Sequence, residues 1–461
     1  MEQFLLNHAV QGAVSFHMPG HKGSDIYKEC GHGEFLDRIM DCDITEIPGA
    51  DNLFQAEGII KDLQQRYAAL YDVERSYALI NSTSGGLIAA ILAIVPQGGR
   101  LVMARNSHKA IFNALTLGSI EPVYAQPKMI DEYGISGEIT AEEIERCLKS
   151  APEAAAVVLA SPNYYGICSD IEAIAEVCHR MDKVLIVDQA HGAHLQFFHK
   201  FGCGDGLPLP AERCGADITV NSIHKTLASF TQSAVLNLNS DLVDRYLLED
   251  KLQAIQSSSP SYLLMASLDI NADIIESQGK RIFRHWRKWL DDFYEEAGAL
   301  DGIKLLTAGG MDRTKINIDA GQPGSELLYH LMMKDIIPEL VTGNIVMCMS
   351  GIGNTRADYR RLLRALKKFR PGDEHPENLQ IPRPGRLHGM PEEWEYVPLQ
   401  EAAGRIAAAS LIPYPPGIPI VCPGEEITAE MAAYIGDLRG RKYKVVGLND
   451  EGQVRVGRES G

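Results

Sequence analysis

Between residues 55 and 238, short apolar runs alternate with segments whose apolar positions recur at helical spacing. Runs that are apolar throughout, with helices between them, are typical of parallel strands buried on both faces. Strands are expected at 77–80, 101–104, 123–124, 155–160, 183–187 and 218–220, and helices from Gln55 and at 87–95, 110–117, 140–150 and 171–181. The pattern therefore predicts an α/β fold with a mainly parallel sheet.

The pattern changes after Leu238, where longer helices and short strand-like pieces follow. A Ser-rich turn at 256–270 leads into a helix, and the later expected elements are helices at 277–297, 326–333 and 359–369 and strands at 303–306, 316–318 and 345–350. These elements predict a smaller α+β domain. The C-terminal part predicts an α+β segment with a helix around 399–409 and a terminal hairpin from 440–450 and 452–456.

Composition shifts divide the chain into five parts. They are an N-terminal arm at 1–54, a large domain at 55–270, a small domain at 271–370, a Pro-, Gly- and charge-rich linker at 371–386, and a C-terminal domain at 387–461. The arm holds the strings FHMPGHKG (16–23) and DITEIPGADNL (43–53), which Pro-Gly steps mark as loops. Such loops serve either as surface turns or as arms that line a site.

Charge and cysteine content narrow the class of protein. The 461 residues carry a net charge of −17, which argues against nucleic acid or an anionic membrane as a partner. Nine cysteines without a Cys-x-x-Cys pair indicate reduced thiols and a cytoplasmic location. We expect no signal peptide, because the N-terminus lacks a basic start with a long apolar stretch, and no membrane span. Cys30, His32 and Cys42 match no zinc spacing, and we expect no metal.

Reactive side chains follow four of the expected strands. Ser84, His108, Asp188 and Lys225 each come just after an apolar run. The carboxyl ends of parallel strands meet at one edge of a sheet, where ligands bind. Lys225 stands beside His224 and close to Ser222. Such a lysine suits a Schiff base with an aldehyde cofactor, although most loop lysines are only solvated.

The cofactor that fits this edge is pyridoxal phosphate. Asp188 would pair with its ring nitrogen, His108 would stack on one ring face, and the small Ala190 would lie against the other. NSTSGG (81–86), between a strand and a helix, has the form of a phosphate cradle, although an ordinary helix cap explains it equally well. The phosphate-side candidates are Thr83, Ser84, Gly85, Ser222 and His224. Metal catalysis and serine hydrolysis are disfavoured, because His191 and His194 lack a third ligand and no Gly-x-Ser-x-Gly is present.

Taken in order, the motifs resemble those of the Orn/Lys/Arg decarboxylase family. They are FHMPGHKG, DITEIPGADNL, NSTSGG, RNSHK, ASPNYYG, DQAHGAH, SIHKTL, SSSPSY and IPYPPGIPIVCPGE, and they run nearly end to end. The resemblance is to compact members without an N-terminal wing domain. It implies the aspartate-aminotransferase fold (PLP fold type I) and decarboxylation of a basic amino acid. Arginine to agmatine for polyamine synthesis is favoured, ahead of lysine to cadaverine and ornithine to putrescine.

The resemblance also implies site roles. Lys225 would hold the cofactor, Asp188 would pair with the ring nitrogen and His108 would stack on the ring. A homodimer with sites at the subunit interface is implied, with Ser259 lent to the neighbour's cofactor. The substrate-side candidates are His191, His194 and Asp51. Gln189, Phe54 and Ala56 depart from the family pattern near the substrate pocket. The alternatives are another reaction of the same cofactor (aldolase, β-lyase or aminotransferase) or a non-catalytic protein of this fold.

Overall fold

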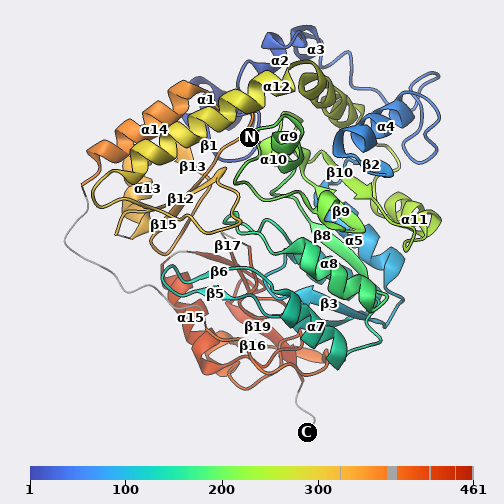
Figure 1. Ribbon diagram of the computed structural model, residues 1–461. Coiled ribbons are helices and arrows are strands. Elements are labelled where there is room, and N and C mark those ends of the chain that lie inside the picture. The colour runs from blue at the N-terminus through green and yellow to red at the C-terminus, as the bar shows by residue number, and fades with distance from the viewer. Residues whose placement is uncertain (322, 371–381, 415–416, 442, 459–461) are drawn as a thin grey trace.

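A computed structural model describes residues 1–321, 323–370, 382–414, 417–441 and 443–458. Its largest sheet has seven strands (Figure 1). In spatial order they are β2 (Arg75–Leu79), β10 (Ala234–Leu238), β9 (Ile218–Asn221), β8 (Val184–Asp188), β7 (Ala156–Ala160), β3 (Arg100–Ala104) and β4 (Glu121–Ala125). β10 is antiparallel to both of its neighbours, and the other pairings are parallel. The predicted α/β fold is confirmed.

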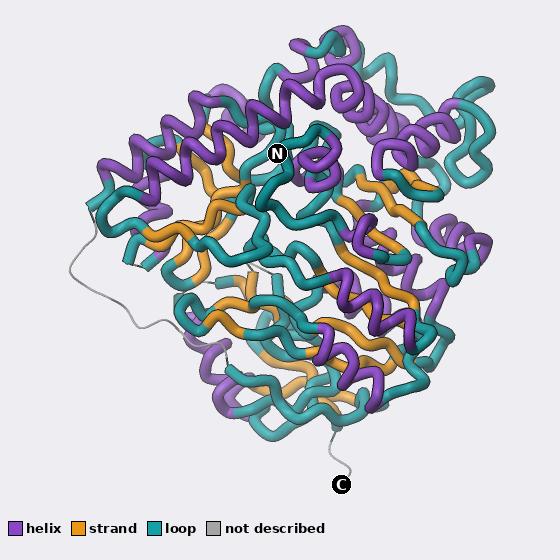
Figure 2. The backbone as a smooth tube through the Cα atoms, in the orientation of Figure 1, coloured by secondary structure: helices purple, strands orange, loops and turns teal. Residues whose placement is uncertain are grey.

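Helices cover both faces of this sheet (Figures 1 and 2). One face carries α5 (Ser82–Ile94), α6 (Lys109–Gly118) and α11 (Arg245–Ile255), and the other carries α7 (Ala141–Ser150) and α8 (Ile171–Arg180). Strand β8 shows how one strand contributes side chains to the cores on both faces of the sheet. Val184 and Ile186 belong to the first core, whereas Leu185 and Val187 belong to the second, because side chains alternate along a strand.

The helix predicted from Gln55 begins later than expected, as α4 (Ile59–Tyr71). The cause is Asp51, whose carboxylate accepts hydrogen bonds from backbone N–H groups of Gly58 at 2.9 Å and Ile60 at 2.9 Å. A side-chain acceptor at a helix start satisfies N–H groups that have no intrahelical partner. Residues 52–58 therefore form a turn that is closed by Asp51.

The small domain is built on α12 (Tyr262–Gly298), a single helix of 37 residues that joins the two helical segments expected separately. It carries an antiparallel sheet of β11 (Lys304–Leu305), β12 (Lys315–Asp319), β15 (Ile345–Met349) and β14 (Leu340–Thr342), with α13 (Gly324–Met332), β13 (Ile336–Pro338) and α14 (Arg356–Lys368). α12 and α14 lie side by side (Figure 1). The predicted boundary at 270 falls inside α12, and the division into domains stays a prediction.

The N-terminal arm contains more regular structure than its sequence indicated. It forms α1 (Glu2–Val10), β1 (Val14–Phe16), α2 (Ile26–Glu29) and α3 (Gly33–Asp37). β1 pairs in parallel with β13, which ties the arm to the small domain. The string at 16–23 is an ordered loop, in which the N–H of Gly20 donates to the carbonyl of His224 at 2.7 Å. The arm loop therefore reaches the segment that carries Lys225.

The C-terminal part corrects two predictions. The helix around 399–409 is wrong: only a short 3-10 turn forms at Leu399–Glu401, and Ile406 and Ala407 bridge instead to Glu426 and Val456. Tertiary pairing overrides helix propensity here. The terminal hairpin forms only beside its turn, where Leu448 bridges to Val454. The longer strands pair elsewhere, as β16 (Trp394–Pro398) with β19 (Gln453–Gly457) and β17 (Ile412–Tyr414) with β18 (Lys444–Val446).

The C-terminal helix α15 (Ala429–Gly440) was not predicted, and short elements β5 (Met129–Ile130), β6 (Ile135–Ser136), α9 (Leu195–Lys200) and α10 (Ile223–Thr226) lie in the large domain. Residues 371–381 of the predicted linker lie outside the described residues. All nine cysteines are free thiols. Among the described helices, none has the length and apolar character needed to cross a membrane.

Candidate active site

Lys225 lies at the carboxyl edge of the large sheet. β9 ends at Asn221, and Ser222 precedes the single turn α10 that carries the lysine. The Lys225 Nζ is 2.9 Å from Nε2 of His191. Burial lowers the pKa of Lys225 to about 8, against the opposing effect of the carboxylates of Asp188 and Glu339. A substantial fraction of this lysine is therefore a free amine near neutral pH, the form that reacts with an aldehyde.

Asp188 is the last residue of β8, the strand beside β9. Its Oδ1 accepts a hydrogen bond from the backbone N–H of Ala190 at 3.1 Å. No group within the described ranges hydrogen-bonds to Oδ2, although the residue is buried. Burial raises the pKa of Asp188, and Lys225 opposes that rise. A buried carboxylate with a free oxygen is suited to receive a protonated ring nitrogen.

His108 follows β3 and caps α6. Its Nδ1 accepts a hydrogen bond from the N–H of Ala110 at 3.2 Å, which fixes the ring. Burial lowers the pKa of His108 to about 4, and Lys225 and Lys109 act in the same direction. The ring is thus neutral near pH 7. A neutral, fixed imidazole can stack on a cofactor ring without adding charge.

The start of α5 lies next to Ser222. Thr83 and Ser84 lie in the first turn, between Ser82, whose N–H donates to Gln232, and Gly85, whose N–H donates to Asn81. The hydroxyls of Thr83 and Ser222 are 3.2 Å apart and join the helix start to the β9 end. N–H groups at a helix start bind phosphate well. A Cβ at Gly85 would stand 3.0 Å from the Asn81 side chain, so the turn is tight.

His224 directly precedes Lys225 in α10. Its Nδ1 is 2.9 Å from the carbonyl oxygen of Ser233, and burial lowers its pKa to about 4. These groups fit the three functional parts of pyridoxal phosphate. The free oxygen of Asp188 suits its ring nitrogen, the lowered pKa of Lys225 suits its aldehyde, and the start of α5 suits its phosphate. The fit rests on the chemistry of these residues.

The structure brings His191 to this site and leaves three predicted residues apart from it. His194 has no exposed surface and contacts Thr226 and Asp312. The carboxylate of Asp51 is occupied by the helix-start contacts of α4. Ser259 is exposed in the turn before α12, where its N–H donates a hydrogen bond to Oγ of Ser257 at 3.2 Å. Ala190 is buried directly after Asp188, as expected.

Sequence reasoning missed several residues around Lys225. The ring of Tyr164 lies 4.6 Å from that of His191. Tyr164 donates its hydroxyl to Oε1 of Glu339 at 2.8 Å, and Oε2 of Glu339 accepts the N–H of Met18 at 2.8 Å. Tyr164 lies in the motif ASPNYYG, so the sequence offered a signal by which it could have been chosen as a site candidate. Glu339 lies between β13 and β14 and had no local signal, because only folding brings the small domain here.

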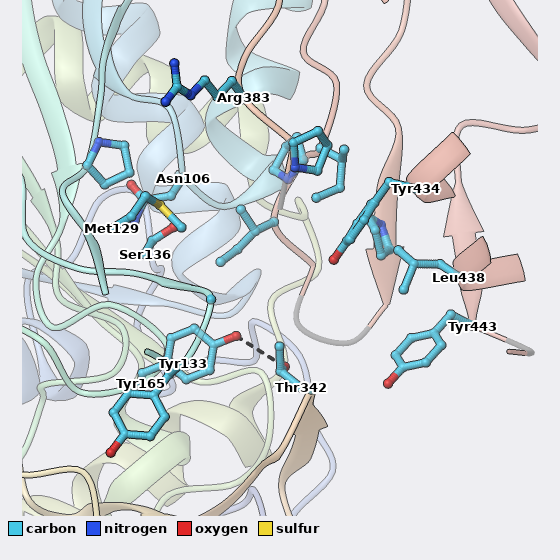
Figure 3. A pocket seen from close by; sticks show the side chains of 18 of the residues that line it. Asn106, Met129, Tyr133, Ser136, Tyr165, Thr342, Arg383, Tyr434, Leu438 and Tyr443 are labelled. Atoms are coloured by element: carbon cyan, nitrogen blue, oxygen red, sulfur yellow. Dashed lines mark hydrogen bonds between the residues drawn. The ribbon is translucent and has the colours of Figure 1, made fainter. Parts of the chain in front are cut away.

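A buried ion pair links the loop before His108 to the C-terminal part. Arg105 donates to both oxygens of Glu425, at 2.7 and 2.6 Å, and to the carbonyl of Ile420 at 2.7 Å. Next to it is a cavity of about 790 Å³. Figure 3 shows Tyr133, Tyr165, Tyr434 and Tyr443 around it, with a bond of 3.2 Å from Tyr165 to Thr342. The charged residues that line it are arginines, so it does not suit a cation.

Family models match most of the chain. The model for the Orn/Lys/Arg decarboxylase major domain matches residues 1–287, and that for the C-terminal domain of the same family matches residues 366–455. An uncharacterized protein of Bacillus subtilis is 33% identical over 96% of this chain and 95% of its own length. An arginine decarboxylase of the same organism is 31% identical over 94% of this chain and 91% of its own length.

A solved structure shares the fold. The constitutive lysine decarboxylase of E. coli superimposes with a TM-score of 0.75 at 19% identity, covering 99% of this chain and 81% of that chain. At this identity the likeness supports the fold alone. It agrees with the arrangement of a mainly parallel large sheet beside a smaller antiparallel one.

Proposed function

The chain belongs to the Orn/Lys/Arg decarboxylase family, and from this premise we propose that it decarboxylates arginine to agmatine, with lysine and ornithine as lesser substrates. It is an amino-acid decarboxylase by family, and its cofactor is pyridoxal phosphate. One observation carries the proposal: Lys225, Asp188, His108 and the start of α5 meet at one edge of the sheet. The 31% identical arginine decarboxylase supports arginine as the first substrate to test.

When bound, pyridoxal phosphate would withdraw electrons from the Cα bond that breaks. Lys225 supplies the amine that binds the aldehyde, and Asp188 supplies the buried negative charge that keeps a ring nitrogen protonated. Neutral His108 offers a flat, fixed face against which the ring would stack. Thr83, Ser84 and Ser222 would hold the phosphate at the start of α5. His224 limits that pocket on the side of the arm loop.

The reaction requires one bond to break and one proton to be delivered. The bond between Cα and the carboxylate carbon breaks, carbon dioxide leaves, and a proton takes its place on Cα. Two groups of this chain can deliver that proton: the Lys225 ammonium, or His191 after its Nε2, 2.9 Å from the Lys225 Nζ, has taken a proton from the lysine. The ring of Tyr164 packs against that of His191, with the ring centres 4.6 Å apart, and helps to keep it in place.

We propose Glu339 as the partner of the substrate's distal cation, in place of Asp51. Its negative charge raises the pKa of both Lys225 and Lys22, and its hydrogen bond to Tyr164 places it next to the residue whose ring packs on His191. Among the described residues, Oε1 of Glu339 accepts a hydrogen bond from Tyr164 and Oε2 accepts one from Met18, so each oxygen keeps a second lone pair. Asp188 faces the cofactor and Asp312 is fully buried in another ion pair. A guanidinium is well suited to such a carboxylate.

We propose a homodimer as the working unit. Helix α1 has no buried residue, and Phe4, Leu5 and Leu6 are 69%, 56% and 54% exposed. Apolar side chains gathered on a terminal helix favour a partner surface. Ser259 is exposed within its own chain, which supports its proposed contact with the neighbour's cofactor. A cytoplasmic location stays a prediction.

The decisive experiment incubates the purified protein, loaded with pyridoxal phosphate, with arginine, lysine and ornithine in separate reactions. Products are resolved by mass, and released carbon dioxide is measured. We expect agmatine and carbon dioxide from arginine at the highest kcat/KM. A keto acid product would indicate an aminotransferase, and no carbon dioxide from any of the three would contradict the proposal.

A further inference from the structure

Asp312 and Lys315 form a fully buried ion pair in the small domain. The Lys315 Nζ is 2.8 Å from Oδ2 of Asp312, and neither side chain is exposed. Lys315 is the first residue of β12, and Asp312 lies in the turn before it. Burying two charges costs free energy that their attraction often fails to offset. Stability alone therefore does not account for the pair, and its contacts with other segments indicate what else it does.

Lys315 reaches the loop after β8. Its Nζ donates to the carbonyl oxygen of His191 at 2.5 Å and to Oγ1 of Thr314 at 3.3 Å. With Asp312, these two acceptors make three, which matches the three N–H donors of the ammonium group. The backbone of His191 is thus held from the small domain, while its ring faces Lys225.

Asp312 reaches the segment after β9 through a histidine. Its carboxylate lies 3.2 Å from Nε2 of His194, and Nδ1 of His194 lies 3.1 Å from Oγ1 of Thr226. Thr226 directly follows Lys225 in the chain. The Asp312–Lys315 pair therefore contacts both of the segments that meet where Lys225 touches His191.

We propose that Asp312 and Lys315 act together as a positioning pair that keeps His191 and Lys225 in register from the small domain. The two segments leave separate strands of the large sheet, and the ion pair bridges them from outside that sheet. This inference rests on the proposed role of Lys225 as the cofactor-binding lysine. It assigns neither Asp312 nor Lys315 a contact with substrate or cofactor.

The pair also acts on the site through its charge. Lys315 lowers the pKa of Lys225 and that of His191, in each case after the larger effect of burial. The other groups coupled to Lys225 are the carboxylates of Asp188 and Glu339 and the histidines His108, His191 and His224. Removing the charge of Lys315 should raise the pKa of Lys225, since a like charge then disappears.

The test compares Lys315→Met with the double variant Asp312→Asn/Lys315→Met. The control is Asp217→Asn, because Asp217 is also a buried carboxylate beside a histidine, 3.0 Å from His179, but stands before β9 at the opposite end of the sheet. Two quantities are measured. One is the thermal midpoint, and the other is the pH midpoint of Lys225 in the apoprotein, from its rate of acetylation by acetic anhydride followed by peptide mass.

In Lys315→Met, we expect the pH midpoint of Lys225 to rise by about one unit and kcat to fall in the loaded enzyme. The double variant should regain thermal stability, because no unpaired buried charge remains, yet keep the shifted midpoint and the low kcat. Asp217→Asn should lose stability with the midpoint unchanged.

Two results would overturn the proposal: a wild-type midpoint in Lys315→Met, or recovery of both midpoint and kcat in the double variant. The readout on the apoprotein does not depend on the reaction. A wild type that shows the expected Lys225 titration but releases no carbon dioxide would contradict the proposed function and leave the positioning pair intact.

Discussion

The Nζ of Lys225 and Nε2 of His191 lie 2.9 Å apart, and the two residues come from the ends of adjacent parallel strands. His191 is buried, and burial together with the charges of Lys225 and Lys315 lowers its pKa well below its usual value. The imidazole is therefore neutral near pH 7 and can accept a hydrogen bond from the lysine. This contact places a proton acceptor next to the amine that reacts.

The low pKa of Lys225 predicts how its reaction with the cofactor depends on pH. The free amine reacts, so the rate of covalent binding to the apoprotein should rise with pH and level off above about 8, well below the usual lysine range. Absorbance of the lysine-bound cofactor measures the rate. Lys225→Ala should show no such band, whereas Lys149→Ala, on the surface of α7, should behave as wild type. A plateau only above pH 10 would contradict the buried amine.

Asp188→Asn should keep the cofactor but lose turnover. The phosphate cradle and Lys225 remain, while the charge that stabilises a protonated ring nitrogen is gone. A charge-assisted hydrogen bond of about 3 kcal/mol corresponds to about a 100-fold loss in kcat. Steady-state rates, normalised to the amount of bound cofactor, measure this loss in kcat. Turnover near wild type would show that Asp188 does not pair with the ring.

Glu339→Gln should weaken recognition of the substrate's side chain. We expect kcat/KM for arginine to fall about 100-fold, while that for the uncharged analogue citrulline changes little, because only arginine carries the distal cation. Glu326→Gln on α13, an exposed glutamate of the same domain, is the control. Equal losses for the two substrates would assign Glu339 to holding Tyr164 and the arm instead.

Glu425→Gln should detach the C-terminal part from the loop that leads to His108. Removing one partner of a buried ion pair leaves Arg105 charged and unpaired, at a cost of about 3–5 kcal/mol. The first thermal transition should fall by several degrees, and protease cleavage after residue 386 should become faster. The exposed pair of Arg458 and Glu393 offers a comparison, since Glu393→Gln should change the first transition little.

The proposed dimer predicts complementation between two inactive variants. Lys225→Ala removes the amine, and Ser259→Arg should disturb the neighbour's cofactor site. Coexpression of the two should restore part of the activity, because a mixed dimer contains one site with both wild-type residues. Light scattering on the wild type should give twice the chain mass of 50.6 kDa. A monomer with full activity would refute the shared site.

The large sheet and its reactive edge followed from sequence because their signals are local. Apolar runs fixed β7, β8 and β9, and the polar residues just after them were expected to meet. The errors lie where pairing is not local. Residues 405–407 have a helix-like composition but pair across the C-terminal part, and β18 and β19 choose partners far along the chain.

The sequence by itself determined the α/β pattern, the edge that carries Lys225, Asp188, His108 and the phosphate cradle, and the family. Tertiary structure alone decided that Glu339 contacts Tyr164 and Met18 and that Asp312 and Lys315 contact the segments on either side of the site. It also decided that Asp51 and His194 are structural, since their polar atoms are already occupied. The physical reason is distance along the chain: the positions of strands and helices follow from local hydrophobic patterns, whereas strand order and contacts between domains depend on how distant segments pack.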